Sequence, residues 1–206
     1  TLKVFNNVPL VNGITLNQKK AYFRPSEDTL VTNTNAGTLA HEYGHYIDYK
    51  TGSRKIGEFD IAPKPWSFEN KKFREAFEKD VEIFTVDATK VADKLEKYHK
   101  ELVELRYYDK KIRGRTRRIG YYEGKLEGDR YICDIIDAMV KGKFHSINKA
   151  PGHGLNYYKN KQKQMTETFA NLFALQKNKR ALDFLKDIIP NTMKQFDERI
   201  KELAKW

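Results

Sequence analysis

The sequence has little cysteine, no long apolar run and no recognisable leader. Cys133 is the only cysteine in 206 residues, so an internal disulfide cannot form and a reducing compartment is expected. No run of 18 apolar residues occurs, so we expect neither a membrane span nor a membrane partner. The first ten residues contain neither a basic n-region nor an apolar h-region, so we expect no signal peptide in this fragment.

What the chain does have is a core-forming composition and an excess of positive charge. Hydrophobic residues make up 39% and aromatic residues 13%, which excludes a disordered chain. The length fits one domain over residues 1–206, and because the sequence does not begin with Met we expect it to be a piece of a longer protein. The formal net charge of +11 is compatible with nucleic acid or an acidic partner, but it specifies no chemistry.

The pattern of apolar and turn-forming residues predicts an α+β, mainly helical fold with a small N-terminal sheet. Short β-prone stretches lie at 21–24 and 29–32, and Ser67 looks like the N-cap of a helix that carries Phe73, Phe77 and Phe84. A second charged helix should follow Asp87. Further helices are expected at about 38–50, 131–141, 163–177, 180–189 and 192–205.

The string His41-Glu42-Tyr43-Gly44-His45 is the most informative motif. On a helix, histidines at i and i+4 lie one above the other, so both can reach one Zn²⁺ at about 2.0–2.1 Å. Glu42 then lies beside the metal, where it can act as a general base toward a water molecule. The alternative is two surface histidines that flank a solvated glutamate.

A catalytic zinc site usually takes three protein ligands, so a third must come from elsewhere in the chain. No histidine follows His45 closely. The best candidate is Glu167, which precedes Asn171 by one helical turn on the margin of an apolar face. Asn171 could orient the second ring nitrogen of His41 or His45. An ordinary boundary glutamate remains the alternative.

The motifs HEYGHYID and ETFANLF together resemble a gluzincin, in which HExxH is followed by a glutamate on a later helix. They look most similar to the anthrax lethal-factor-type catalytic domain and to the zincin-like metallopeptidase domains of phage minor head or head-morphogenesis proteins. The resemblance covers roughly the first 50 and the last 65 residues. Residues 53–130 do not match it and are interpreted as a helical, basic insertion.

The resemblance implies that Glu167 is the third zinc ligand of a zinc-dependent endopeptidase. It also implies that a tyrosine upstream of this glutamate stabilises the oxyanion, with Tyr158 preferred over Tyr157 and with His153 assisting. The aspartate of the first motif, Asp48, is expected to support the metal ligands without binding the metal itself. An edge strand within 21–32 would bind extended peptide by strand addition.

The same resemblance places the protein in the bacterial cytoplasm or in a phage virion, with capsid or portal components as further partners. The densest charge lies at 106–118, with seven basic residues against one acid. Basic groups beside tyrosines can hold phosphates and stack bases, although most such runs are solvated. The residues concerned are Lys110, Lys111, Arg113, Arg115, Arg117 and Arg118. The alternative function is therefore a zincin-fold structural module with little turnover that contacts DNA or capsid proteins.

Overall fold

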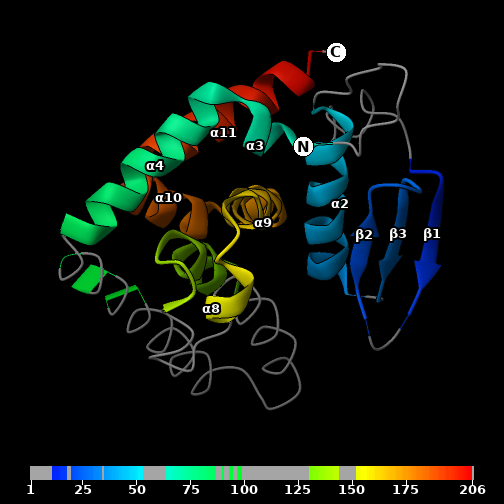
Figure 1. Ribbon diagram of the computed structural model, residues 1–206, viewed down its shortest axis with the longest axis horizontal. Helices are drawn as coiled ribbons and strands as arrows, with labels where there is room; N and C mark the ends of the chain where they lie inside the picture. The colour runs from blue at the N-terminus through cyan, green and yellow to red at the C-terminus, as the bar shows by residue number, and fades with distance from the viewer. Residues whose placement is uncertain are drawn as a thin grey trace, which may run out of the picture.

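The computed structural model describes residues 11–17, 20–33, 35–52, 64–86, 90, 93–94, 97–98, 130–143 and 152–205. These residues form a mainly helical α+β fold with a small N-terminal sheet, as the sequence predicts. In Figure 1 the layers follow one another from right to left: the sheet, the helix α2, the helix α9, and then α4 with α10 and α11.

The sheet has three strands, β1 (Gly13–Leu16), β2 (Tyr22–Arg24) and β3 (Thr29–Thr32). Their order is β1-β3-β2, with β1 parallel and β2 antiparallel to the central β3. The turn between β2 and β3 contains Asp28 at a φ of 49°, a conformation that aspartate tolerates better than most residues. The strand β2 is therefore an edge strand, and it lies next to α2 (Figure 1).

Helix α2 (Ala36–Lys50) begins where the side chain of Asn35 accepts a hydrogen bond from the backbone N–H of Thr38 at 2.9 Å. Such a cap satisfies one of the free amides at the helix start. The helix packs on β3 and β2 with one face and on α9 with the other. Tyr46, which is fully buried, packs its ring in a T-shaped contact against Phe23 of β2 and so joins the helix to the sheet.

Ser67 lies inside the short helix α3 (Trp66–Glu69) and does not cap a longer one. Helix α4 (Lys71–Val86) instead begins after Asn70, whose side chain accepts from the N–H of Phe73 at 3.0 Å. The expectation for Ser67 was wrong because its hydroxyl has a distant partner, Asp48 on α2.

The C-terminal third consists of α8 (Gly154–Tyr157), α9 (Lys161–Ala174), the 3₁₀ turn η1 (Leu175–Lys177), α10 (Lys179–Ile188) and α11 (Pro190–Leu203). Residues 130–139 form a further helix that ends near Gly142, at a φ of 80°. Helix α4 packs along α11, and Phe169 of α9 contacts both Phe73 and Phe196 with its ring. The core therefore joins α9 to the helices on the side away from the sheet.

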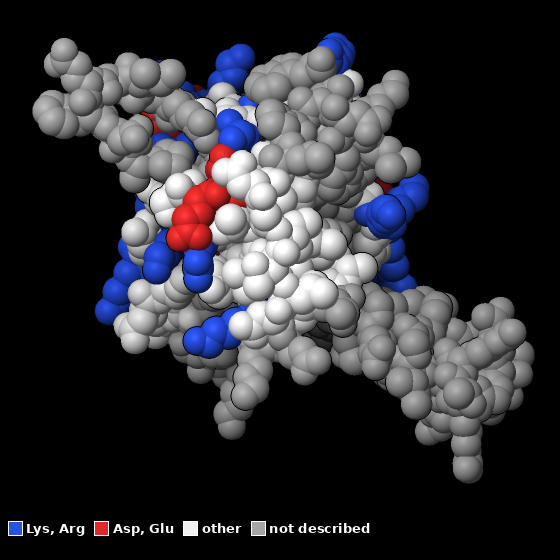
Figure 2. Space-filling view, turned by 90° about the vertical axis from the view of Figure 1, so that its right-hand side faces the viewer, with Lys and Arg blue, Asp and Glu red and all other residues white. Residues whose placement is uncertain are grey.

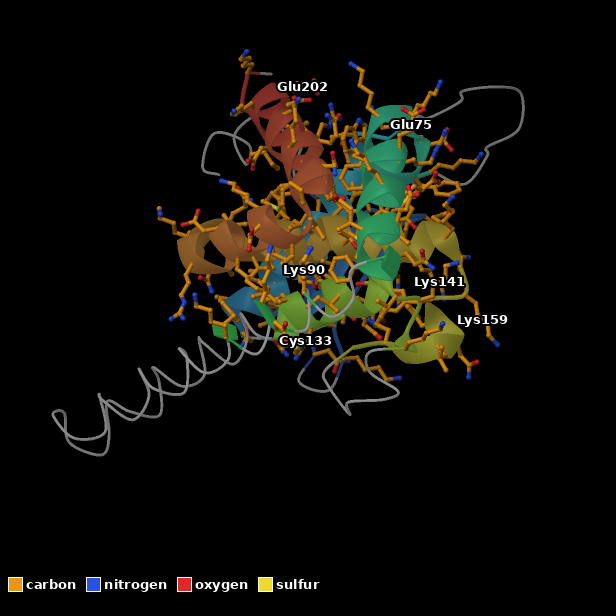
Figure 3. The ribbon with its side chains drawn as sticks, turned by 90° about the vertical axis from the view of Figure 1, so that its left-hand side faces the viewer. Glu75, Lys90, Cys133, Lys141, Lys159 and Glu202 are labelled. Carbon is orange, nitrogen blue, oxygen red and sulfur yellow. The ribbon has the colours of Figure 1, made fainter. Side chains whose placement is uncertain are left out.

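The outer surface differs between the two sides of the molecule. The view onto the sheet side shows a broad area that is neither acidic nor basic (Figure 2). Two large apolar residues of β1, Ile14 and Leu16, are exposed. On the opposite side, charged groups such as Glu75 of α4 and Glu202 of α11 project outward, while Cys133 is buried (Figure 3). Among the described residues, no helix is both long and apolar enough to cross a membrane.

Candidate metal centre

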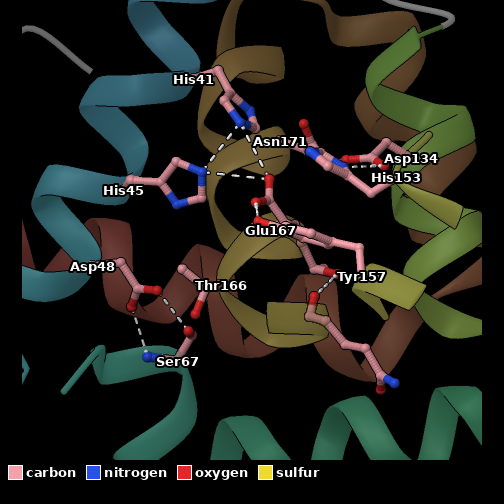
Figure 4. A network of polar contacts seen from close by, with 12 residues as sticks. His41, His45, Asp48, Ser67, Asp134, His153, Tyr157, Thr166, Glu167 and Asn171 are labelled. Carbon is pink, nitrogen blue, oxygen red and sulfur yellow. Dashed lines mark hydrogen bonds and ion pairs between the residues drawn. The ribbon is translucent and has the colours of Figure 1, made fainter. Parts of the chain in front are cut away.

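Three side chains from two helices meet at one point between α2 and α9 (Figure 4). His41 Nε2 lies 3.2 Å from His45 Nε2, and Glu167 Oε2 lies 3.3 Å and 3.4 Å from these two nitrogens. The histidines project from α2 and the glutamate from α9, which are the elements predicted from the sequence. The structure confirms that these residues form a group that could hold a metal ion.

The size of this triangle fits zinc. With bonds of about 2.0–2.1 Å at tetrahedral angles, two zinc ligands are about 3.3 Å apart. The side chains are 13%, 12% and 6% exposed, so the group is reachable but largely buried. Glu167 Oε2 accepts no hydrogen bond of good geometry from any described residue. Its contacts are the longer ones to the two histidine nitrogens, and a cation in the centre of the triangle would bind this buried oxygen directly.

Without a metal, the three groups hold each other in an ion-pair arrangement. Burial alone would lower the pKa of His45, but the charge of Glu167 and the contact with it outweigh burial and raise this pKa to about 9. Burial alone would raise the pKa of Glu167, but the two histidines hold it well below its ordinary value. Protonation of the imidazoles therefore competes with metal binding, and a metal ion must displace the proton from the ring nitrogens that it binds.

Close contact between α2 and α9 makes the triangle possible. A Cβ added to Gly44 would come within 2.8 Å of Ala170 Cα and 3.0 Å of Phe173 Cβ. The motif's glycine and the small Ala170 therefore let the helix backbones approach closely. This approach brings Glu167, one turn earlier on α9, opposite both histidines.

Glu42 lies on α2 directly after the first histidine and is only 6% exposed. Burial raises the pKa of its carboxyl, and the negative charge of Glu167 adds to this, while the two histidines oppose it. A backbone hydrogen bond from Phe23 of β2 also lowers it. The carboxylate thus stands between the metal triad and the edge strand, with a proton affinity shifted toward that of a general base.

The two candidate tyrosines have different surroundings. The hydroxyl of Tyr157 donates to Glu167 Oε1, next to the metal triad (Figure 4). Tyr158 is fully buried, and its hydroxyl donates to Asp134 Oδ1 at 2.7 Å. Burial and the neighbouring carboxylates raise the pKa of both phenols, so both stay protonated donors at neutral pH. The geometry therefore favours Tyr157 over Tyr158 as the donor nearest the metal.

His153 precedes α8 and stacks on the ring of Tyr157, with 4.2 Å between the ring centroids. Its Nδ1 lies 2.9 Å from Asp134 Oδ1. Burial would lower the pKa of His153, but the hydrogen bond and charge of Asp134 and the charge of Glu167 raise it overall. His153 is therefore a partly exposed donor with a raised affinity for a proton beside the triad.

Asn171 has a different partner from the one that the sequence suggested. Its Nδ2 donates to Asp134 Oδ2 at 2.8 Å and not to either histidine ring. The amide is directed by Asp134, a residue of the helix 130–139 that faces α9. His41 instead stacks flat against Tyr131 of that helix, with 5.8 Å between centroids and a 10° angle between the ring planes.

Asp134, His153 and Glu167 form a second group with metal-ligand spacing. Both carboxylate oxygens of Asp134 already accept hydrogen bonds, from Tyr158 and His153 at Oδ1 and from Asn171 at Oδ2. A metal would have to displace these donors. In the first group, the contacts that Glu167 Oε2 makes with described residues are to the two histidine nitrogens, which would themselves be metal ligands, so this group is the better site.

Asp48 is fully buried one turn after His45 and accepts two hydrogen bonds from Ser67, from the N–H at 2.7 Å and from the hydroxyl at 2.6 Å. Burial raises its pKa to about 7, although the bonds from Ser67 and the charges of His45 and Arg199 oppose this. Asp48 thus fixes the end of α2 to α3 rather than bonding to a ligand ring.

Sequence reasoning missed Tyr131 and Asp134. Asp134 and Asp137 stand at i and i+3 in the otherwise apolar run 131–140, and buried acids on such a helix are a signal of a polar network. The predicted partner-binding residues at 110–118 lie outside the described part of the chain. Comparisons with models of protein families, with curated proteins and with solved structures found no match to this chain.

Proposed function

We propose that this protein is a zinc-dependent endopeptidase of the gluzincin kind, with one zinc ion bound by His41, His45 and Glu167. The observation that carries the proposal is the triangle of two Nε2 atoms and Glu167 Oε2, with sides of 3.2–3.4 Å. A buried glutamate, Glu42, directly follows the first ligand, and a purely structural zinc site has no need for a base there.

A zinc ion held by His41, His45 and Glu167 would supply the activated nucleophile, because zinc with three protein ligands typically lowers the pKa of its water to about 7. Glu42 would take up a proton from the attacking water at its carboxylate, and its raised pKa suits this role. The same carboxyl then delivers the proton to the nitrogen of the leaving amine. Glu42 thus acts first as a base and then as an acid within one turnover.

Negative charge that develops on the attacked carbonyl oxygen needs donors beside the metal. The Tyr157 hydroxyl and the His153 ring both line the recess that contains the triad. Tyr157 would exchange its bond to Glu167 for one to the substrate oxygen. Asp134 holds His153 through Nδ1, so the other ring nitrogen stays free to face the substrate.

We propose that the edge strand β2 binds the peptide backbone by strand addition. It pairs with β3 on one side, and its Phe23 backbone bonds to Glu42 on the side of the metal. An extended peptide added along this edge would pass over Glu42 and the triad. Recesses on both sides of the triad leave room for side chains that flank the scissile bond.

Two variants test this function. Metal analysis should find about one zinc per wild-type chain and much less in His41→Ala. Glu42→Gln should keep the zinc but lose cleavage of a broad peptide library, since removal of a general base typically costs about 10²–10⁴-fold in rate. Equal zinc in wild type and His41→Ala would overturn the metal site.

The same measurements decide between the peptidase and a structural module. A structural zincin module would bind zinc through the same three residues, yet wild type and Glu42→Gln would both leave the library intact. The proposed setting in a phage or prophage head, with capsid or portal partners, is supported by the motif resemblance alone. A nucleic-acid partner is supported only by the basic composition of 106–118.

A further inference from the structure

Two recesses meet at the metal triad, and they differ in chemistry. The larger, of about 450 Å³, is called here the polar recess; the smaller, of about 300 Å³, is called the aromatic recess. Four residues line both, namely Ala21, His41, Glu42 and His153. Because β2 begins beside the polar recess and runs along the aromatic one, a peptide on this edge would place residues from opposite sides of its scissile bond in the two recesses.

The polar recess has a cation on each of two walls. Lys20 comes from the segment just before β2, and Arg130 comes from the start of the helix 130–139. Both residues are exposed, and neither forms an ion pair with a carboxylate of the described residues. Arg130 lies 5.9 Å from the centroid of the Tyr131 ring, while Lys163 of the aromatic recess lies closer to a ring, 4.2 Å from that of Tyr157.

The acidic residues of the polar recess do not neutralise these cations. Glu42 and Asp134, which line the same recess, are only 6% and 5% exposed, whereas the two cations are exposed. Asp134 is also fully engaged by three donors. The two exposed cations, which have no carboxylate partner among the described residues, are therefore more accessible to a carboxylate of a ligand than the two buried acids are.

We propose that Lys20 and Arg130 bind a carboxylate of the substrate on one side of the scissile bond, so that the protein selects acidic peptides. This inference rests on the peptidase function proposed above. The carboxylate can belong to an internal Asp or Glu side chain or to the free C-terminus of the peptide. In the first case the protein is an acid-selective endopeptidase, and in the second it trims peptide ends.

The test is cleavage of a proteome-derived peptide library by the zinc-loaded protein, with the cleavage sites read by mass spectrometry. Wild type should enrich Asp and Glu, or the peptide C-terminus, at one fixed position relative to the cut. The double variant Lys20→Gln/Arg130→Gln should lose about threefold to fivefold of that preference for each cation removed. Lys179→Gln, which removes an exposed lysine on α10, is the matched control and should leave the preference unchanged.

The outcomes separate this inference from the proposed function. Glu42-dependent cleavage with no acidic preference, or with a preference that survives in the double variant, overturns the inference and leaves the peptidase function intact. No cleavage at all refutes the peptidase function. Calorimetric titration of zinc-loaded wild type with end-blocked tetraglutamate and tetraglutamine peptides then tests whether the polar recess prefers a carboxylate. Equal binding of the two peptides overturns the inference. Blocked and unblocked tetraglutamate distinguish the side chain from the C-terminus.

Discussion

Two adjacent tyrosines have different hydrogen-bond partners at the candidate metal centre. Tyr157 is turned toward the metal triad and donates to Glu167, whereas Tyr158 is turned into the core and donates to Asp134. Tyr157 is the last residue of the short helix α8 and Tyr158 is its C-cap, and the planes of their rings lie 82° apart. Under the proposed function, Tyr157 would act on the substrate, and Tyr158 would hold Asp134 in place.

Removal of each hydroxyl should therefore give different results. Tyr157→Phe should lower kcat by about 10²-fold or more while zinc content stays near one per chain, because it removes a donor to the developing oxyanion. Tyr158→Phe should instead lower the free energy of unfolding by about 1–3 kcal/mol, because it leaves the buried Asp134 carboxylate with one donor fewer. Steady-state kinetics and denaturant titration of both variants measure the contrast. A larger loss of kcat in Tyr158→Phe would reverse the assignment.

Among single residues, those that belong to one helical motif can be predicted from the sequence, whereas contacts between segments that are distant in the sequence cannot. His41, Glu42 and His45 follow from a helical spacing, so the motif alone was sufficient. Glu167 lies more than 120 residues away along the chain, and spacing alone could not separate it from a boundary glutamate. The choice between the two tyrosines and the partner of Asn171 depend on the helix 130–139, whose position follows from core packing rather than from any motif.

The packing of α2 against α9 sets the geometry of the centre at the scale of elements. Each helix carries part of the ligand set, so the distance between the helix axes controls whether three ligand atoms can share one ion. Gly44 and Ala170 lie at the point of closest approach. A methyl group at Gly44 has backbone atoms in its way, which cannot move aside as a flexible side chain can.

Gly44→Ala should therefore weaken zinc binding even where the fold survives. Overpacking at such a contact lowers the stability of a protein by about 1–3 kcal/mol, while the higher helix propensity of alanine raises it by about 1 kcal/mol. We expect a modest loss of stability together with at least a tenfold loss of zinc affinity in competition with a chelator. Gly37→Ala, in the first turn of the same helix, is the control for helix propensity. Unchanged zinc affinity in Gly44→Ala would contradict the importance of close helix contact.

Asp48, which links α2 to α3, should make the free energy of unfolding depend on pH. The pKa of Asp48 is about 7 in the folded protein and about 3.9 in an unfolded chain, so the folded state binds the proton more tightly. The stabilisation that protonated Asp48 provides is fully present below about pH 4 and is lost as the pH rises to about 7. Between these limits the loss reaches about 1.4 kcal/mol per pH unit.

Asp48→Asn tests this link, because asparagine mimics the protonated acid and can still accept from the Ser67 N–H while its amide donates to the Ser67 hydroxyl. Near pH 4 the variant should match wild type, and toward pH 8 it should become the more stable of the two. Denaturant titrations across this range in the presence of EDTA measure the difference without a contribution from metal binding. Parallel stability profiles of the two proteins would mean that the pKa of Asp48 is not raised.

Most element positions could be predicted, because periodicity and caps are local signals. The strands at 22–24 and 29–32 and the helices α2, α9, α10 and α11 lie close to their expected places. Ser67 shows where such reasoning fails. A serine at the start of an apolar period looks like an N-cap, but its hydroxyl is used by Asp48, so Asn70 caps the longer helix instead.

At the scale of the whole molecule, the metal centre joins two packing units. Helix α2 is held by the sheet, where Tyr46 contacts Phe23, and α9 is held by the helices beyond it, where Phe169 contacts Phe73 and Phe196. The triad spans the boundary between these two sets of contacts. A zinc ion there would therefore act as a cross-link between the sheet side and the helical side of the core.

Zinc should accordingly raise the thermal stability of the entire chain. A ligand that binds only the folded state stabilises it by about 2.7 kcal/mol at a free concentration of 100 times its Kd. For a chain of this size each kcal/mol corresponds to about 2–4 °C, so Tm should rise by about 5–10 °C with zinc and fall again with EDTA. His41→Ala should melt at one temperature in both conditions, whereas Glu42→Gln should keep the full zinc-dependent shift because the base is not a ligand. A shift of equal size in His41→Ala would place the stabilising zinc elsewhere on the protein and remove the cross-link between α2 and α9.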